Sequence, residues 1–191
     1  LTWGKGGFGR LGHGHTDGVA EPTIVEALRH VTVVKIACGF AYSAAISGSA
    51  ELYTWGAGEN GRLGLGDTKD RKVPNRVSAL AHIRVASVAA GSVHTCILSA
   101  DGNLYTCGKC EYSGHGSTVD LLTPQLLDFF DAPLQHVTVG PGGYHTIALS
   151  VVGEVYSWGH NRVGQLGYRH ISSLPRNPEG AYYLPTPKLI P

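Results

Sequence analysis

Two cysteines, Cys107 and Cys110, form a C-x-x-C motif. Thiols at this spacing act as a redox pair when a helix N-terminus lowers a thiol pKa, or bind zinc together with two further ligands. The sequence offers neither a strand–helix–strand setting nor two more ligands at a suitable spacing. We therefore predict no metal site here, and we interpret Cys107, Cys38 and Cys96 as small apolar residues within strands.

A second motif, G-x-G-x-x-G, occurs at Gly56, Gly58 and Gly61 after the strand-like run "ELYTW". A dinucleotide site of this type needs a helix after the third glycine, because the helix N-terminus holds the pyrophosphate. Further turn-forming residues and a proline follow Gly61 instead. The same glycine pattern recurs 52 residues earlier, at Gly4, Gly6 and Gly9. We therefore predict tight turns and no cofactor.

The ten histidines and scattered carboxylates do not form a recognisable catalytic set. His94 and His145 occupy equivalent positions of a repeat, and His13 and His15 lie in a loop. The sequence contains no G-x-S-x-G elbow, H-E-x-x-H helix or phosphate-loop lysine. We predict no catalytic residue, and intrinsic enzyme activity stays open as an alternative.

The composition excludes several classes of protein. The chain has 191 residues, 42% of them hydrophobic, and its 15 Lys and Arg against 14 Asp and Glu give a net charge of +1. A near-neutral chain has no global attraction for nucleic acid or membrane. No apolar run approaches the roughly 18 to 20 residues of a membrane span, and no signal peptide is visible at the start. We expect an intracellular protein, cytoplasmic or nuclear, without a membrane partner.

An internal repeat dominates the sequence. Four residues that each precede a glycine recur at spacings of 52, 52 and 51: Trp3, Trp55, Cys107 and Trp158. Two sets of glycines keep the same period and mark turns after these residues: Gly9, Gly61 and Gly164, and then Gly12, Gly64, Gly116 and Gly167. We interpret all of these as structural repeat positions.

Each repeat contains four short strand candidates, rich in Val, Ile, Tyr and Thr and bounded by Gly or Pro. Four strands at a fixed period of about 51 to 52 residues predict the blades of an all-β propeller. The small residues of "IACG" and "VAAG" suit the crowded innermost strand of such a blade.

The segments "YTWGAGENGRLGLGD" and "VASVAAGSVHTCILSADGNLYTCG" resemble the regulator-of-chromosome-condensation repeat. This resemblance covers essentially the whole chain and implies a propeller of seven blades, of which about three and a half repeats are present here. We expect one partial propeller over 1–191, in which 1–28 end one blade, 29–80 and 81–131 each form a blade, and 132–191 form a blade with an insertion near 172–183.

A propeller presents rigid faces lined by loops, and function on such scaffolds resides in loop side chains. Aromatic residues and arginine are enriched at protein interfaces. The candidate partner-binding residues of this kind, with one glutamate among them, are Phe8, Arg10, Glu59, Arg62, Tyr112, Arg162, Tyr182 and Tyr183. The insertion stands out because it breaks the repeat period and contributes both of the last two tyrosines.

The resemblance implies several possible functions. The segments quoted above look closest to the propellers of large HECT-type ubiquitin ligases, which favours a protein–protein interaction module with any catalytic domain outside this stretch. The alternative is guanine nucleotide exchange on a small GTPase combined with chromatin association, although no segment resembles the exchange wedge. A plant UV-B photoreceptor would need the tryptophan of a G-W-R-H-T motif, which "GFAYS", "GSVHT" and "GGYHT" lack.

Overall fold

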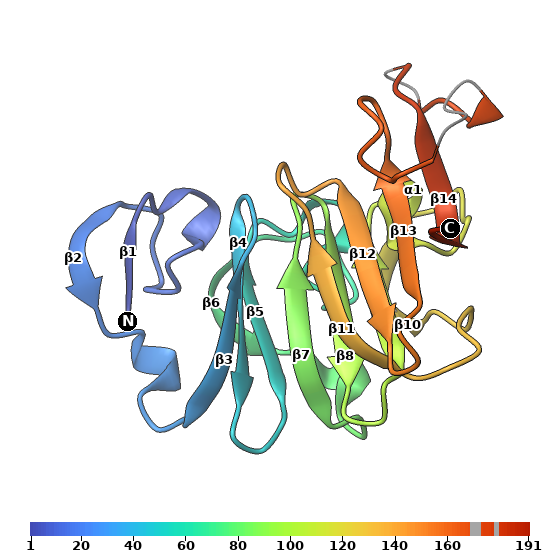
Figure 1. The fold of residues 1–191 in the computed structure, drawn as a ribbon. Coiled ribbons are helices and arrows are strands. Elements are labelled where there is room, and N and C mark those ends of the chain that lie inside the picture. The colour runs from blue at the N-terminus through green and yellow to red at the C-terminus, as the bar shows by residue number, and fades with distance from the viewer. Residues whose placement is uncertain (169–172, 178–179) are drawn as a thin grey trace.

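The computed structural model describes residues 1–168, 173–177 and 180–191, and it folds them into four antiparallel sheets (Figure 1). The first sheet has two strands, β1 (Thr2–Gly4) and β2 (Val19–Thr23). The second contains β3 (Val33–Cys38), β4 (Tyr42–Ser47), β5 (Leu52–Gly56) and β6 (Arg71–Arg76). The third contains β7 (Val85–Ala90), β8 (His94–Ser99), β9 (Leu104–Gly108) and β10 (Leu121–Leu126). The fourth contains β11 (Leu134–Val139), β12 (His145–Ser150), β13 (Val155–His160) and β14 (Tyr183–Leu189).

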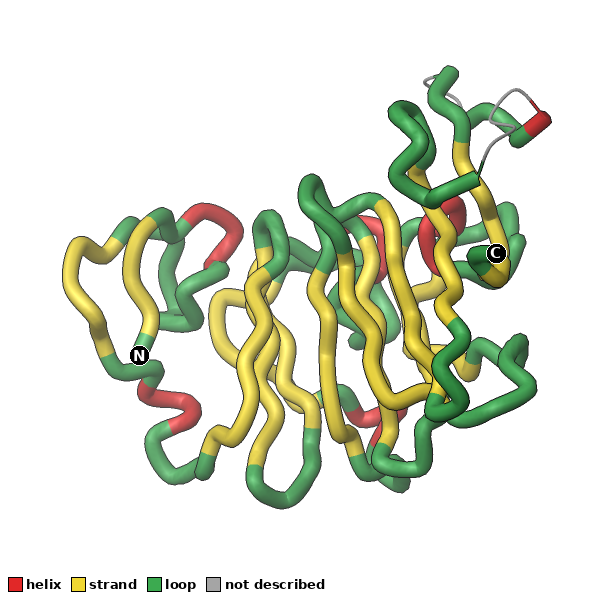
Figure 2. The backbone as a smooth tube through the Cα atoms, in the orientation of Figure 1, coloured by secondary structure: helices red, strands yellow, loops and turns green. Residues whose placement is uncertain are grey.

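Strands and loops make up nearly all of the described chain, as Figure 2 shows, and the helical segments are single turns. These turns are η1 (Gly7–Gly9), η2 (Glu26–Leu28), η3 (Glu59–Gly61), η4 (Ser78–Leu80) and α1 (Cys110–Ser113). None of these described helices has the length and apolar character needed to cross a membrane. The all-β prediction with four-stranded blades is confirmed.

The sheets stand face to face, and each follows the previous one along the chain (Figure 1). Within each four-stranded sheet the hydrogen-bonded order follows the sequence order, so every connection joins neighbouring strands. The first strands β3, β7 and β11 contact one another from sheet to sheet. The small residues predicted for the innermost strand therefore lie where consecutive sheets converge.

The hydrophobic core lies between the sheets, because successive side chains of a strand point to opposite faces. On β8, Ile97 packs toward the second sheet, whereas Cys96 and Leu98 pack toward the fourth. All six residues of β8 are buried as a result. Each sheet thus shares its core with its neighbours, as propeller blades do.

The repeated tryptophan position belongs to this core in the complete sheets. Trp55, Cys107 and Trp158 are all buried. Trp3 is different, with 59% of its surface exposed. Its strand β1 pairs only with β2, so no strand covers the other edge of the first sheet.

The repeated glycines form the turns that the sequence predicted. Gly61 has a φ of +78°, and a Cβ atom there would lie 2.6 Å from the Cα of Leu122 in the next sheet. A positive φ strains a residue that has a side chain, and the close backbone approach leaves no room for one. The chain leaves the single turn η3 at this glycine and continues through loop to β6, so no long helix follows the G-x-G-x-x-G motif.

The residue before each repeated tryptophan position is a serine or threonine, and its hydroxyl donates a hydrogen bond to the loop that follows. Thr2, Thr54 and Ser157 each donate to the backbone carbonyl nine residues later, at Leu11, Leu63 and Leu166, over 2.6 to 2.8 Å. Thr106 donates to the carbonyl of Ser113 at 2.6 Å. These hydrogen bonds hold the loop between the third and fourth strands of each sheet against its own blade.

Candidate interaction surface on the loop face

In an antiparallel sheet of four strands, the first and third connections lie at one end and the second connection at the other. We call the end that carries the first and third connections the loop face; it is uppermost in Figure 1. All eight predicted partner-binding residues follow the last strand but one of their sheet, and seven of them precede its last strand. The exception is Tyr183, the first residue of β14.

A pocket of about 770 Å³ opens on this face across the second, third and fourth sheets. Four of the eight predicted residues line it: Glu59, Tyr112, Arg162 and Tyr182. Its remaining lining residues come from the same set of loops: Asn60, Val93, Lys109, Tyr144, His160, Arg176, Asn177, Gly180 and Ala181. The pocket is thus assembled from segments more than one hundred residues apart.

An aromatic series forms the inner wall of the pocket. The Tyr112 ring packs edge-on against Tyr144, with 5.5 Å between ring centroids, and it also contacts His94 at 6.2 Å. Tyr144 contacts the ring of His160 at 6.2 Å. Burial lowers the pKa of His160, and the nearby positive charge of Arg162 lowers it further.

The insertion supplies the outer wall through the residues that the structure describes. Arg176 and Tyr182 form a β-bridge, and the guanidinium lies 4.1 Å from the centroid of the Tyr182 ring. Asn177 is buried and donates from Nδ2 to the Tyr112 hydroxyl at 3.2 Å. The insertion is thereby docked onto α1 of the preceding blade. Residues 172, 178 and 179 of the predicted insertion lie outside the described residues.

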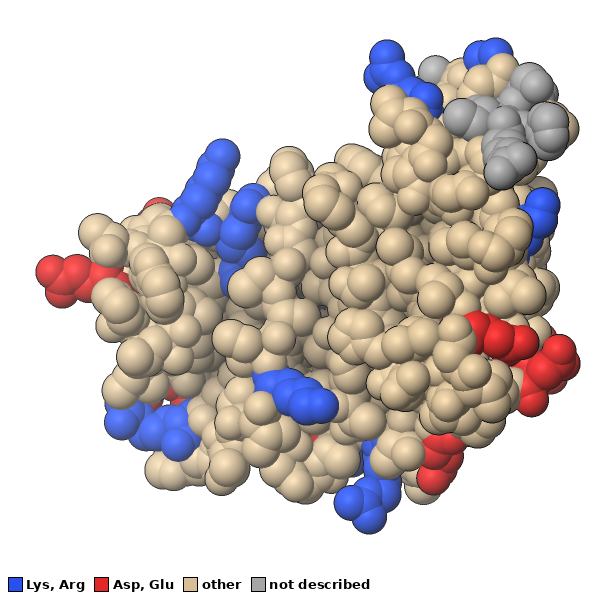
Figure 3. Space-filling model, viewed as in Figure 1, with Lys and Arg blue, Asp and Glu red and all other residues tan. Residues whose placement is uncertain are grey.

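Positive charge is in excess around the pocket. Its charged lining residues are Glu59, Lys109, Arg162 and Arg176. The Glu59 carboxylate is paired with Arg62 at 2.7 Å. In Figure 3, Lys and Arg side chains project along the upper edge of the molecule and also from its lower part, whereas most of the visible Asp and Glu side chains lie at the lower right.

Arg62 itself is 4% exposed, which contradicts its prediction as a partner contact. Its Nη1 donates to the carbonyl of Ser92 in the next sheet at 2.8 Å. Arg10, one repeat earlier, donates from Nη1 to the carbonyl of Phe40 at 3.1 Å. Because the two arginines occupy one repeat position and make the same bond between blades, we assign both a structural role and omit them from the proposed surface.

The two remaining predicted residues lie outside the pocket lining. Phe8 is 51% exposed on η1, with the Arg10 guanidinium 5.6 Å from its ring centroid. Tyr183 is half-buried and pairs with His160 across the sheet. Neither lines the pocket, so the structure divides the predicted residues between a clustered group and isolated ones.

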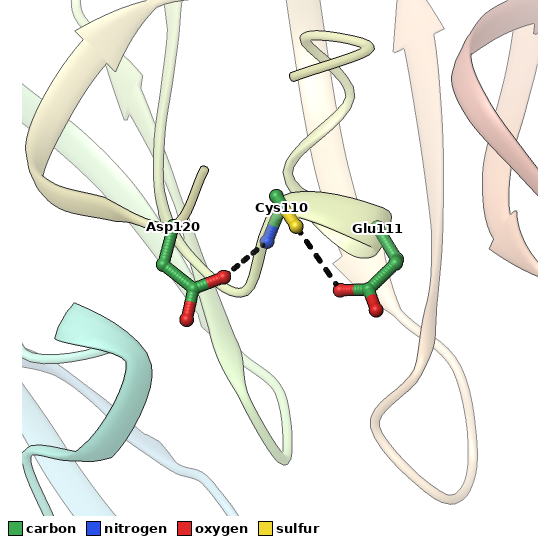
Figure 4. Close-up of side chains that lie close together, drawn as sticks. All are labelled: Cys110, Glu111 and Asp120. Atoms are coloured by element: carbon green, nitrogen blue, oxygen red, sulfur yellow. Dashed lines mark hydrogen bonds between the residues drawn. The ribbon is translucent and has the colours of Figure 1, made fainter. Parts of the chain in front are cut away.

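The C-x-x-C motif has a structural setting. Cys107 belongs to the core between the second and third sheets. Cys110 lies close to Glu111 and Asp120 in an arrangement that could hold a metal ion (Figure 4). Both carboxylates are already engaged, however: Asp120 accepts from the Cys110 amide at 3.0 Å and from Asn60 at 2.9 Å, and Glu111 accepts from the Cys110 thiol at 3.3 Å.

The thiols are also held in the neutral form, whereas a nucleophile needs thiolate. Burial, together with Glu111 and Asp120, raises the pKa of Cys110 to about 12. Burial raises the pKa of Cys96 to about 12 and also raises that of Cys107. We therefore interpret the Cys110 cluster as a structural hydrogen-bond network at the start of α1.

Several pocket residues could have been found from the repeat. Val93 and Tyr144 occupy one repeat position, directly before the histidines His94 and His145 in the first connection of each blade. That connection shares the loop face with the third one, so the topology alone brings them together. Arg176 carried a weaker signal, its presence within the insertion.

These features define a class: a set of β-propeller blades whose loop face carries a pocket shared by three consecutive blades. Models of the regulator of chromosome condensation (RCC1) repeat match residues 1–46 and 49–98, and again 85–114 and 137–165. The chain belongs to the RCC1 repeat family.

Similar proteins differ in how much of their own length this chain spans. The ultraviolet-B receptor UVR8 of Arabidopsis thaliana is 38% identical over 87% of this chain and 38% of its own length. The human E3 ubiquitin-protein ligase HERC2 is 40% identical over 87% of this chain and 4% of its own length. Yeast RCC1 (Prp20), in its crystal structure with Kap60, matches 99% of this chain and 44% of its own at a TM-score of 0.79 and 25% identity.

The chain thus spans less than half the length of each of these relatives. The match to HERC2 agrees with the resemblance to ligase propellers found in the sequence. The tryptophan position of the photoreceptor motif is occupied here by Phe40, Ser92 and Gly143.

Proposed function

We propose that this chain is a protein–protein interaction module whose binding site is the pocket on the loop face. The convergence of Glu59, Arg162 and Tyr182 on one pocket, against the buried ring of Tyr112, is the observation that carries this proposal. Tyrosine and arginine dominate the energetics of many protein interfaces. The rigid sheets beneath the loops keep these side chains in place without a folding cost on binding.

Photo-crosslinking from the pocket tests the proposal. A benzophenone amino acid at Tyr182 is expected to crosslink a partner protein, which mass spectrometry identifies and which is then purified. Tyr182→Ala and Arg162→Ala are each expected to weaken that purified partner's binding by about tenfold. The controls Val152→Ala and Arg84→Ala lie on exposed positions at the opposite end of the sheets and are expected to leave binding unchanged. Equal losses in all four variants would place the partner elsewhere.

Guanine nucleotide exchange on a small GTPase, with chromatin association, is the second candidate. The observation in its favour is the matching fold of Prp20p from Saccharomyces cerevisiae, whose structure was described with its binding to Gsp1p and histones. An exchange factor accelerates release of labelled GDP from its GTPase in vitro. Unchanged release rates across a panel of small GTPases would remove this candidate.

A ligase function would belong to a longer protein. The HERC2 and HERC5 relatives carry ligase in their names, and this chain spans only 4% and 17% of their lengths. We infer that the present chain would contribute recognition to such a protein, and that the chemistry would lie in other domains.

A further inference from the structure

We propose that the pocket on the loop face binds an acidic peptide segment of the partner. This inference rests on the proposed interaction function and specifies the chemistry of its partner. It is carried by the charges, by the hydrogen-bond capacity of two arginines and by the aromatic wall.

Cations predominate among the charged residues of the pocket. Lys109, Arg162 and Arg176 line the pocket, and the fourth charged residue, Glu59, is neutralised by Arg62. The Lys109 Nζ lies 3.6 Å from a carboxylate oxygen of Glu111. The chain as a whole has a net charge of only +1, so the excess of cations is a property of this pocket. Complementary charge selects an acidic partner and repels a basic one.

The two arginines of the pocket have N–H donors available for a ligand. Arg162 is exposed and has no hydrogen-bond or ion-pair partner within residues 1–168, 173–177 and 180–191. Arg176 is exposed but held in place: it donates to the Gly180 carbonyl at 3.0 Å and to the Tyr182 hydroxyl at 2.6 Å, and its Cζ lies over the Tyr182 ring. A guanidinium has five N–H donors, so Arg176 keeps further donors for a carboxylate.

The size and the aromatic wall of the pocket suit a peptide segment. Its volume of about 770 Å³ accommodates a few side chains. Tyr144, which is 41% exposed, and Tyr182 offer ring surfaces beside the cations, against which a peptide backbone can pack. A peptide with acidic side chains satisfies the arginines and the aromatic wall together.

Nucleic acid fits this arrangement less well. Phosphate backbones are bound by cations spread along a track. Here Lys109, Arg162 and Arg176 instead converge on one pocket. We therefore commit to a protein segment.

Fluorescence anisotropy with a labelled peptide of alternating glutamate and serine tests the proposal. The glutamate peptide is expected to bind, the matched glutamine–serine peptide is not, and added NaCl is expected to weaken the binding. Arg162→Glu is expected to weaken binding by about tenfold or more. The matched variant Arg84→Glu, which makes the same charge change at an exposed position at the opposite end of β7, is expected to change it by less than about twofold.

Three results would overturn the inference: equal binding of the two peptides, equal losses in the two variants, or tighter binding of an oligothymidylate than of the glutamate peptide. Thermal melts of both variants establish that they fold. A partner that crosslinks at Tyr182 but is not displaced by the glutamate peptide would leave the interaction module standing and refute only its acidic chemistry. Binding of the peptide without any protein crosslink would instead refute the interaction proposal.

Discussion

Buried polar side chains join the blades of this protein at single, identifiable bonds. The Tyr42 hydroxyl donates to the carbonyl of His94 in the next sheet at 2.8 Å, and the His94 ring pairs with Thr146 of the sheet beyond at 2.8 Å. Arg62 makes a third such link through the Ser92 carbonyl. Buried groups of this kind are costly to leave unpaired, so each link is expected to be important for stability.

The Arg62 link gives the first prediction. Arg62→Ala removes a buried guanidinium and leaves the Ser92 carbonyl without this donor, so we expect a loss of about 2 to 4 kcal/mol in the free energy of unfolding. Arg162→Ala, at an exposed arginine of an equivalent loop, is expected to stay within about 0.5 kcal/mol. Urea unfolding of the two variants measures both values. Similar stabilities would contradict the structural role of Arg62.

The His94 ring predicts a pH dependence. Burial lowers its pKa from 6.5 to about 4, with a smaller contribution from the charge of His145. In the unfolded chain the His94 ring therefore takes up a proton near pH 6.5, whereas in the folded protein it does so only near pH 4. Stability from this residue is complete above pH 6.5 and declines as the pH falls toward 4, by about 1 to 3 kcal/mol.

Urea unfolding at a series of pH values tests this expectation. His94→Gln keeps a polar side chain that can pair with Thr146 but cannot titrate. The difference in unfolding free energy between the two proteins should therefore shrink or reverse as the pH is lowered. Because burial also lowers the pKa of His115, His145 and His160, both proteins lose stability in acid, and only their difference reports on His94. Parallel pH profiles would show that His94 does not titrate differently on folding.

The loops between third and fourth strands share a common pattern of glycines. At Gly61 both the backbone conformation and the space beside it require glycine. We expect Gly61→Ala to cost about 3 kcal/mol or more, because the substituted residue would combine a positive φ with a backbone contact at 2.6 Å. Gly153→Ala is the matched control: its φ is +90°, but a Cβ there meets nothing within 4 Å, so it should cost only about 1 to 2 kcal/mol. Thermal or urea unfolding compares them, and equal losses would mean that the contact with the next blade relaxes freely.

The sequence predicted the elements well because they repeat. The strands, the turns at Gly61 and Gly64 and the core position of Trp55 all follow from the fixed period and from local residue preferences. The pocket was predicted only in part, because it depends on which loops meet across three sheets. Arg62 shows why residue type was insufficient: an arginine in a loop suggests a surface contact, and only the three-dimensional structure reveals the carbonyl of the next blade that it reaches.

The second, third and fourth sheets are held together by core residues packed between neighbouring sheets. The first sheet differs, because a groove lies between it and the second sheet. A groove of about 800 Å³ separates β1 and β2 from the second sheet, and its lining includes Trp3, Ile36 and Phe40. All three side chains are exposed, Ile36 and Phe40 to 75%. In the other sheets the corresponding space between neighbours is filled by core residues.

This difference predicts that the three tryptophans respond unequally to a soluble quencher. Acrylamide is expected to quench Trp3 readily, whereas Trp55 and Trp158, at 3% and 0% exposure, are shielded by neighbouring blades. Trp3→Phe should remove most of the quenchable emission, and Trp55→Phe should leave it in place. If Trp3 is instead protected, the groove is covered in solution, and sedimentation would show whether a second copy covers it. Such a result would move the apolar contact from the interior of one chain to an interface between chains, because exposed apolar surface of this extent favours association.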